Sequence, residues 1–465
     1  MFESSSIEAL VAILKTEIAK LAPGDRLPSS RDLVRRNGVS PVTVARAFAL
    51  LASEGAVVTR PGSGTFVAAR RSGSDDQPPD TSWQAVALTD RSVDARTVTD
   101  LLAPPPAGAI TLASGYLHRS LQPTRALGAA LARAARRPDA WDRAPTAGLA
   151  TLRAIFARLA GGDVGPDDVL ITGGGQDALS MAFRAIAAPG SPVLMESPTY
   201  QGALAAARAA ELRPVPVPMD DNGIRPDLLA DAFAMTGARL LYCQPTFHNP
   251  TGVVLAPERR RQILDVARAV GAFVIEDDFA RLLGHGAPVP RALVADDRDG
   301  TVVHLTSLTK PASPSLRIGA LIARGPVMQR LRAIRLVDDF FIARPMQEAA
   351  VELLTTPTWD RHLRALSNAL RERCAVLASA LAREVPDWTV ARIPAGGLHL
   401  WLRLPPGQTE VAEAARAHGV AVGPGRGYFA AEPPGAYLRL GFAAAADLTE
   451  LSEGARRLGE ACRSS

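Results

Sequence analysis

The chain contains very little lysine. Only Lys15, Lys20 and Lys310 are lysines among its 52 lysine and arginine residues, so Lys310 is the only primary amine side chain after residue 20. A guanidinium stays protonated and forms no imine with an aldehyde, so arginine cannot replace lysine in amine chemistry. Lys310 is therefore a candidate nucleophile. On this count alone, a leftover surface lysine is an equal alternative.

Other absences exclude whole classes of protein. Three widely spaced cysteines (Cys243, Cys374 and Cys462) make neither a disulfide framework nor a metal-binding pattern. No apolar run approaches the roughly 20 residues that span a bilayer, and the first residues do not resemble a secretory leader. We therefore expect a cytoplasmic protein with no membrane partner and no metal. Its 465 residues are enough for two or three packed units, and a net charge of +5 permits nucleic-acid binding without arguing for it.

Residues 1–70 have the pattern of three short helices and a hairpin. Apolar residues recur at i, i+3, i+4 and i+7 in two segments, which predicts amphipathic helices. They are Ile7, Leu10, Val11 and Leu14 in the first and Val44, Ala47, Phe48 and Leu51 in the second. Ser29 or Ser30 is expected to cap a helix between them, and residues 57–67 to form a hairpin. This order predicts a winged helix-turn-helix, whose third helix enters the major groove of DNA. A helical protein-interaction module is the alternative.

Three stretches of this segment resemble the GntR family of bacterial regulators, at residues 24–31, 38–44 and 61–67. The resemblance covers about residues 5–68 and implies that several residues contact double-stranded DNA. These are Arg31, Ser40, Thr43, Arg46, Gly62 and Ser63. Pro41 and Ala45 stand where many members have arginine, so we expect a different readout of the bases. Residues 1–70 hold nine lysines and arginines against six aspartates and glutamates, a net charge of +3. Tight binding is therefore expected to need a dimer or several sites.

Residues 71–105 change in character. Residues 72–80 are rich in Ser, Gly, Asp and Pro without apolar periodicity, which predicts a flexible linker. The stretch from Trp83 to Leu102 could include a helix, with Val86, Leu88, Val93 and Val98 as weak anchors.

Residues 106–465 alternate strand-like and helical stretches, which predicts an α/β domain with a mainly parallel sheet between helices. A small C-terminal α+β subdomain is expected from about residue 350. Polar residues follow the predicted strands repeatedly. They are Gly174-Gly175-Gln176 after residues 169–172, Tyr200 after 192–196, Asn249 after 240–243, Asp277 after 273–276, and Ser307, Thr309 and Lys310 after 302–305. Open α/β sheets bind ligands at the carboxyl ends of their strands, so we expect these residues to form one site.

These residue types fit an aldehyde cofactor with a pyridine ring and a phosphate. Such a cofactor needs an amine for an imine, a carboxylate for the ring nitrogen, a donor to the ring oxygen, a stacking aromatic ring and a phosphate cup. In that order the candidates are Lys310, Asp277, Asn249, Tyr200 and, for the cup, Gly174, Gly175, Gln176, Ser307, Thr309 and Arg317. A glycine turn between a strand and a helix can seat a phosphate on backbone N–H groups.

This domain resembles the fold-type I aminotransferases, which use pyridoxal 5′-phosphate (PLP). The resemblance spans about residues 110–460 and rests on four motifs in the family's order, at residues 249–252, 276–278, 307–310 and 316–319. It implies that PLP is bound as an imine on Lys310. It also implies that Arg439, in the motif at residues 437–442, holds a substrate or effector carboxylate in a bidentate fork. A surface ion pair is the alternative for that arginine.

Phe279 departs from the family, whose members usually have a tyrosine there. Phenylalanine cannot donate a hydrogen bond to the ring oxygen of the cofactor. We therefore expect cofactor binding to survive through Asn249 while proton-transfer chemistry weakens. Cys243, His248 and His304 show no metal-ligand spacing, so we expect them to pack or to support neighbouring side chains.

A GntR-like segment joined to an aminotransferase-like domain resembles the MocR regulators. That resemblance implies a homodimeric transcriptional regulator in which PLP, alone or with an amino acid or amine, changes DNA binding. Two alternatives stay open. One is a working aminotransferase with a secondary DNA-binding segment, against which Phe279 argues. The other is a DNA-binding protein whose large domain only dimerises, against which the retained Lys310 argues.

Overall fold

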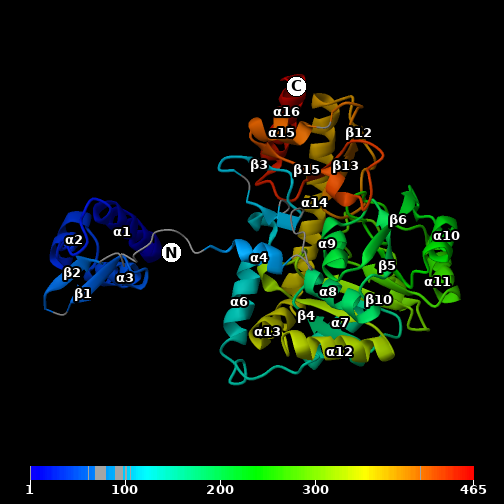
Figure 1. Ribbon diagram of the computed structural model, residues 1–465, viewed down its shortest axis with the longest axis horizontal. Helices are drawn as coiled ribbons and strands as arrows, with labels where there is room; N and C mark the ends of the chain where they lie inside the picture. Colours follow the sequence, from blue (N-terminus) through cyan, green and yellow to red (C-terminus); the bar gives the residue numbers. More distant parts are fainter. Residues whose placement is uncertain are drawn as a thin grey trace. The chain divides into compact units, whose positions relative to one another are not determined.

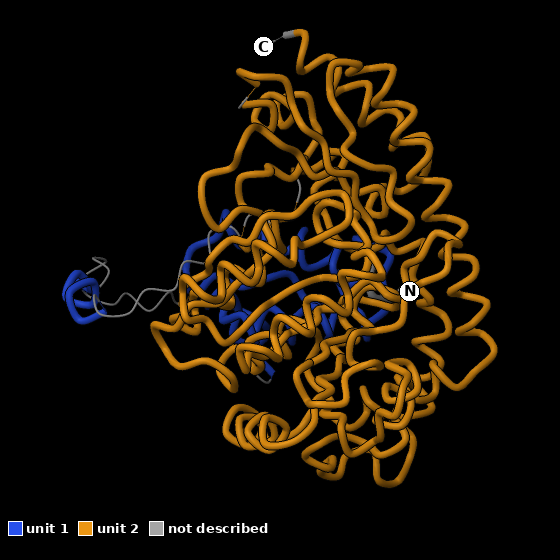
Figure 2. Tube along the Cα trace, turned by 90° about the vertical axis from the view of Figure 1, so that its right-hand side faces the viewer, with its two compact units in different colours: residues 1–90 blue, residues 91–465 orange. Residues whose placement is uncertain are grey.

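The computed structural model describes residues 2–60, 62–68, 80–88, 98–99, 102–104, 106–408 and 410–464. Two compact units make up the chain, residues 1–90 and residues 91–465 (Figure 2). Among the described residues, no helix is both long enough and apolar enough to cross a bilayer.

The first unit contains the predicted winged helix-turn-helix. Its elements are α1 (Phe2–Ile18), α2 (Ser30–Asn37), α3 (Pro41–Ser53), β1 (Val57–Arg60) and β2 (Gly64–Val67). Ser29 caps α2, because its hydroxyl accepts a hydrogen bond from the Asp32 backbone N–H at 3.2 Å. The helix ends at Gly38, whose φ of 63° favours glycine. The predicted apolar faces of α1 and α3 meet in the core of this unit.

Within the predicted linker, the structure describes residues 80–88, 98–99 and 102–104. Residues Ser82–Ala87 form the short helix α4. Val86 and Leu88 were expected to anchor this segment, but they are 75% and 67% exposed, so that expectation is wrong for these two side chains. The third expected anchor, Val93, lies outside the described residues.

The second unit is built on an eight-stranded sheet with the order β4-β11-β10-β9-β8-β5-β6-β7. The strands are β4 (Val169–Thr172), β5 (Pro192–Ser197), β6 (Arg213–Asp220), β7 (Gly223–Ile224), β8 (Leu240–Cys243), β9 (Phe273–Asp277), β10 (Val302–Ser307) and β11 (Gly319–Ile322). β10, β9, β8, β5 and β6 are parallel. β11 is antiparallel to its neighbours β10 and β4, so β4 shares the direction of β10. The carboxyl ends of β4, β5, β8, β9 and β10 therefore meet at one edge.

Helices cover both faces of this sheet (Figure 1). One face packs against α8 (Gly175–Ile186), α9 (Gln201–Ala209) and α12 (Pro326–Asp338). The other packs against α7 (Ala150–Ala160), α10 (Pro226–Thr236), α11 (Pro257–Ala269) and α13 (Arg344–Leu354), and α6 (Thr124–Ala134) lies against α13. Burial on both faces explains why the strands are continuous apolar runs rather than alternating patterns.

A small α+β part completes the second unit. Its elements are α14 (Pro357–Glu384), β12 (Thr389–Val390), β13 (His399–Arg403), α15 (Val411–Ala417), β14 (Val420–Ala421), β15 (Gly423–Pro424), β16 (Tyr437–Gly441) and α16 (Leu448–Ser464). One feature differs from the sequence-based expectation of a purely C-terminal subdomain. β3 (Ile110–Thr111) pairs with β14, and Ile110 and Leu112 pack into the same core as β13 and β16. The chain therefore contributes a strand to the small part before it forms the strands of the large sheet.

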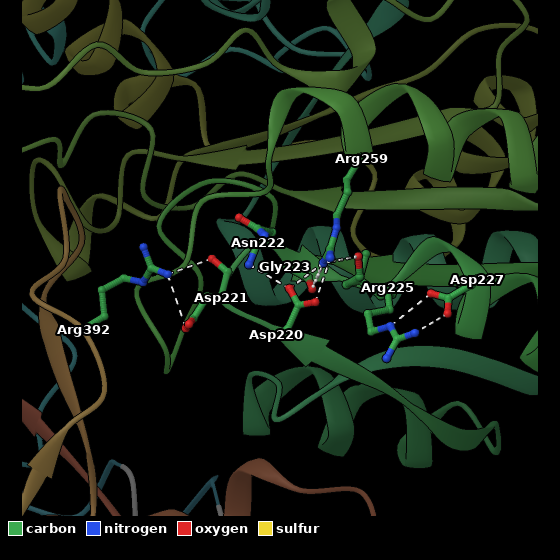
Figure 3. Close-up of polar contacts among 9 residues, drawn as sticks. Asp220, Asp221, Asn222, Gly223, Arg225, Asp227, Arg259 and Arg392 are labelled. Carbon is green, nitrogen blue, oxygen red and sulfur yellow. Dashed lines mark hydrogen bonds and ion pairs between the residues drawn. The ribbon is translucent and has the colours of Figure 1, made fainter.

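Polar contacts fix the turn between β6 and β7 (Figure 3). Arg259 of α11 donates to both carboxylate oxygens of Asp220, at 2.6 and 2.7 Å, and to the Gly223 carbonyl oxygen at 2.8 Å. Arg392, between β12 and β13, donates to the Asp221 carbonyl oxygen at 2.7 Å and so links the small part to the large sheet. Ion pairs near the surface contribute about 0–1 kcal/mol each.

Candidate functional site

The shared edge of the parallel strands borders a cavity of about 350 Å³. Ten of the residues predicted from the sequence line it. They are Gly175, Gln176, Tyr200, Asn249, Asp277, Ser307, Thr309, Lys310, Arg317 and Arg439. Gly174 lies directly before the α8 helix that contributes Gly175 and Gln176. The site therefore assembles at the place predicted from the strand ends.

Lys310 follows β10 and carries the only amine among the lining side chains. Its Nζ donates to the Gly115 carbonyl oxygen at 2.8 Å and lies 3.7 Å from the centre of the Tyr116 ring. Burial, followed by repulsion from Arg439 and Arg317, lowers the pKa of Lys310 to about 7, while Asp277 opposes this shift. A large fraction of this amine is therefore neutral, and nucleophilic, near neutral pH.

Asp277 ends β9 and is almost fully buried. Its Oδ2 accepts hydrogen bonds from the Tyr242 hydroxyl at 2.6 Å and from Gln244 Nε2 at 2.9 Å. Its other oxygen, Oδ1, is buried without a hydrogen-bond partner among the described residues. Burial raises the pKa of Asp277, and the two hydrogen bonds oppose that rise. An oriented carboxylate with one unpaired oxygen fits the protonated nitrogen of a pyridine ring.

The opposite end of the cavity suits a phosphate. Arg317 has a left-handed backbone (φ 51°), and none of the described residues pairs with its guanidinium. A Cβ on Gly174 would lie 2.9 Å from Arg317 Nη2, so glycine leaves room for this arginine at the N-terminus of α8. Ser307 Oγ donates to Thr309 Oγ1 at 2.9 Å on the adjoining β10 end. A helix N-terminus, two hydroxyls and a free guanidinium are the groups that bind phosphate.

Tyr200 is held at the wall of the cavity. Its hydroxyl donates to Gln176 Oε1 at 3.3 Å, and Gln176 Nε2 donates to the Gly202 carbonyl oxygen at 2.9 Å. A Cβ on Gly202 would lie 2.3 Å from Tyr200 Cζ, so a larger residue there would displace the ring. Asn249 Oδ1 accepts from Arg439 Nη1 at 3.4 Å, which leaves the Asn249 amino group as a donor toward the cavity.

Arg439 lies on β16 and is only 1% exposed. Its guanidinium is held by Asn249, by the Ala113 carbonyl oxygen and by the Tyr428 ring, whose centre is 5.3 Å away. Among the described residues, its Nε has no hydrogen-bond partner and no carboxylate lies within ion-pairing distance. The alternative of a surface ion pair is therefore wrong. A buried cation without its own anion is costly unless a ligand supplies one, which makes Arg439 a carboxylate-binding candidate.

Several lining residues escaped the sequence analysis. An ideal Cβ on Gly115 would lie 3.3 Å from His399 Nε2 and 3.7 Å from both Lys310 Nζ and Arg439 Nη1, so these groups surround one small space. His399 Nε2 is buried, and none of the described residues bonds it; burial, together with the charges of Arg439 and Lys310, lowers the pKa of His399. The signal was a histidine at the start of β13, directly before three apolar residues. Gly115 gave none, because it acts through its backbone oxygen. Leu102 also lines the cavity, as does Val98, which the sequence analysis expected to anchor its segment and which is half-buried.

The residues near the strand ends that the sequence set aside are paired within the fold. His304 Nδ1 lies 2.8 Å from Glu276 Oε2, and His248 Nδ1 lies 2.8 Å from Thr251 Oγ1. Glu276, Asp278 and His304 are close enough to one another to share an ion. Backbone N–H groups of residues 293 and 294 already bond Glu276, and Arg281 pairs with Asp278, so these carboxylates are compensated internally. Phe279 lines the cavity with an apolar ring that has no hydroxyl group.

The predicted DNA-contacting residues belong to the first unit. Arg31, Arg46, Gly62 and Ser63 are exposed, the last two at the hairpin turn. Ser40 caps α3: its Oγ accepts from the Thr43 N–H at 3.1 Å and lies 2.9 Å from Thr43 Oγ1. Thr43 itself is only 6% exposed. These two hydroxyls hold the start of α3 in shape, so Thr43 presents little surface to a partner.

Comparison with known proteins separates the same two segments. Residues 109–458 match the family of class I and II aminotransferases, and residues 7–67 match the bacterial regulatory proteins of the gntR family. An uncharacterized HTH-type transcriptional regulator of Escherichia coli (strain K12), YdcR, is 32% identical over 87% of this chain and 87% of its own length. A 2-aminoadipate transaminase of Thermus thermophilus is 34% identical over 77% of this chain and 90% of its own.

A solved structure supports the nature of the cofactor. The α-aminoadipate aminotransferase LysN from Thermus thermophilus, complexed with N-(5′-phosphopyridoxyl)-L-leucine, aligns with a TM-score of 0.74 at 32% identity. The alignment covers 80% of this chain and 95% of that one. Pyridoxal 5′-phosphate is the cofactor that fits the amine, the carboxylate and the phosphate-binding groups described above. The chain belongs to the aminotransferase class I and II family and carries a gntR-type winged helix-turn-helix before it, which is the MocR-like architecture.

Proposed function

We propose that the protein is a DNA-binding transcriptional regulator whose aminotransferase-like unit holds PLP on Lys310 and senses an amino acid or amine there. The observation that carries the proposal is the cavity in which the amine of Lys310 lies together with the guanidinium of Arg439, which has no carboxylate partner among the described residues, in a chain that also has a winged helix-turn-helix. Two relatives that align over 87% and 94% of this chain are named as HTH-type transcriptional regulators.

Different lining residues bind different parts of the cofactor and of the amino acid. PLP, when bound, supplies an aldehyde carbon that bonds to a primary amine and a ring that withdraws electrons. Lys310 offers a neutral amine, Asp277 keeps a proton on the ring nitrogen, and Arg317 with the start of α8 binds the phosphate. Arg439 binds the carboxylate of an amino acid and thereby brings its amine to the side of the cavity where Lys310 lies. Phe279 offers no hydroxyl for moving protons, which favours binding over turnover.

Occupancy of the cavity is proposed to change DNA affinity. Lys310 and Asp277 belong to the large sheet, whereas Arg439 and His399 belong to β16 and β13 of the small part. A ligand that bridges the two parts stabilises the arrangement in which they are close. Such a ligand shifts the population toward the state that it binds better, and DNA binding follows if the two states differ in DNA affinity.

The regulator is proposed to act as a cytoplasmic homodimer on promoter DNA, with Arg31, Ser40, Arg46, Gly62 and Ser63 at the DNA. Thr43 would act by holding the start of α3. The second unit exposes large apolar side chains, with Trp141 at 77%, Val337 at 85% and Phe340 at 66%. A second copy that covers these side chains would account for them. Light scattering is expected to show a dimer that a Phe340→Asp change weakens; an unaltered monomer before and after the change would rule this dimer out.

The experiment for the function compares DNA binding of the full chain in three states: without PLP, with PLP, and with PLP plus each member of a panel of amino acids and amines. The DNA is a duplex selected from a randomised library by the PLP-loaded protein. We expect PLP or one panel member to change the dissociation constant by about 5- to 150-fold, the usual size of coupling between two sites. Equal DNA affinity in all states would refute the sensing role.

The alternative is a working aminotransferase with a secondary DNA-binding unit. It is favoured by the completeness of the cavity, since Lys310, Asp277 and Arg439 are all in place. Steady transfer of amino groups to a 2-oxo acid, at a rate typical of enzymes (about 1–1,000 per second), would establish it. Binding of amino acids without such turnover supports the regulator.

A further inference from the structure

The exposed face at the start of α3 is almost entirely apolar. In residues 41–49, Arg46 is the only exposed side chain with a hydrogen-bonding group. The other exposed side chains are Pro41, Val42, Ala45 and Ala49. Val42 is 57% exposed, whereas the apolar residues on the inner face of the same helix pack into the core. Most of the Val42 side chain is therefore available for a contact outside this unit.

The hydroxyl groups at the start of α3 do not change this picture. Ser40 and Thr43 bond each other at 2.9 Å, and Ser40 also accepts from the Thr43 backbone N–H. Both hydroxyls are therefore engaged in the cap. A recognition helix presents its N-terminal residues to the base edges of the major groove. Here that region offers methyl groups and a single guanidinium.

Major-groove chemistry decides what such a face can recognise. Guanine, cytosine and adenine show only hydrogen-bonding groups there, whereas thymine also shows its C5-methyl group. Val42 and Ala45 lie three residues apart and so share one face of the helix with Arg46. We infer that α3 recognises thymine methyl groups through Val42 and Ala45, with Arg46 as its one hydrogen-bonding contact. This inference rests on the proposed DNA binding and adds the class of sequence that is bound.

The charge around this face favours DNA over an apolar protein partner. Arg31 and Arg36 of α2 are exposed, as is Arg46 on α3 itself. Guanidinium groups flanking a small apolar face suit a partner with phosphates outside and methyl groups inside, which describes a thymine-containing major groove. A protein partner would bury these arginines against its own surface, and it is the competing outcome of the test.

The test uses the full chain loaded with PLP and a duplex that it selects from a randomised library. Each thymine is replaced in turn by deoxyuridine, which keeps base pairing and removes only the methyl group. At one or two thymines in each half-site, affinity is expected to fall about fourfold, the value of one buried methyl group. Methylating the cytosines of the same duplex distinguishes thymine from 5-methylcytosine, and no gain in affinity is expected there.

Two variants assign the effect to α3. Val42→Ala is expected to bind the thymine and deoxyuridine duplexes equally at one of those positions. Ile13→Ala, which changes an aliphatic side chain that is 46% exposed on α1, is expected to keep the fourfold preference. The methyl readout is wrong if no deoxyuridine replacement changes the affinity for the selected duplex. It is also wrong if the Val42→Ala variant keeps the preference for thymine. Neither result contradicts the proposed function. If the full chain selects no duplex, the proposed function falls together with this inference.

Discussion

The Lys310→Ala variant is expected to lose the visible absorption band of bound PLP completely, while Lys20→Ala keeps it. Lys310 is the only primary amine side chain after residue 20, and its Nζ is the only amine at the cavity. None of the arginines around it can form the covalent link, because a guanidinium is not a usable nucleophile. After borohydride reduction and digestion, mass spectrometry should find the cofactor on the peptide with Lys310 in the unaltered protein and on no peptide of the variant.

The control for folding is the pH dependence of stability. Burial lowers the pKa of Lys310 from its ordinary value of 10.5 to about 7, so between these values the unfolded chain holds one more proton than the folded chain. The free energy of unfolding of the cofactor-free protein therefore gains a rising contribution with pH across this window. The Lys310→Ala variant lacks that contribution and should be the more stable of the two near pH 7. An absorption band in the variant, or a slope that it shares with the unaltered protein, would contradict the assignment of a buried amine.

The sequence predicted the large sheet and most of the cavity for one physical reason. Strands buried on both faces are continuous apolar runs, and each run here ends in polar residues that cannot stay in the core. Once β5, β8, β9 and β10 are parallel, their ends meet, so Tyr200, Asp277 and Lys310 come together without any knowledge of side-chain contacts. The cap by Ser29 and the apolar faces of α1 and α3 followed from equally local rules.

The features that escaped prediction depend on contacts between distant segments. β3 has two residues and pairs with β14 about 300 residues later, so no periodic pattern announces it. Gly115 contributes a carbonyl oxygen, which every residue has. The burial of Thr43 beside Ser40 likewise depends on how the start of α3 packs. His399 lies on β13 of the small part, and the antiparallel pairing of β13 with β16 places it beside the strand that carries Arg439.

The Arg439→Met variant is expected still to be fully loaded by excess PLP and to lose affinity for amino acids by about 10- to 100-fold. Hydrogen bonds to charged groups contribute about 1.5–3 kcal/mol each, and this guanidinium is buried without a competing carboxylate. The affinity is measured from the spectral change when amino acids are added to the PLP-loaded protein. Amines that lack a carboxylate should bind the variant and the unaltered protein equally. Arg403→Met, an exposed arginine on the neighbouring strand β13, is the matched control.

A merely structural role for Arg439 would give a different set of results. Loss of structure would weaken amines and amino acids alike and lower the melting temperature. If Arg439 instead binds a carboxylate, the variant should be more stable than the unaltered protein. Replacing a buried cation that has no counter-ion with an apolar side chain of similar length removes a desolvation cost. Arg439 also lowers the pKa of Lys310, so the variant should need a higher pH to bond PLP at the same rate. If the variant binds amines and amino acids equally weakly, melts at a lower temperature and keeps the same pH dependence, Arg439 is only a packing residue. There would then be no reason to expect an α-carboxylate on the effector.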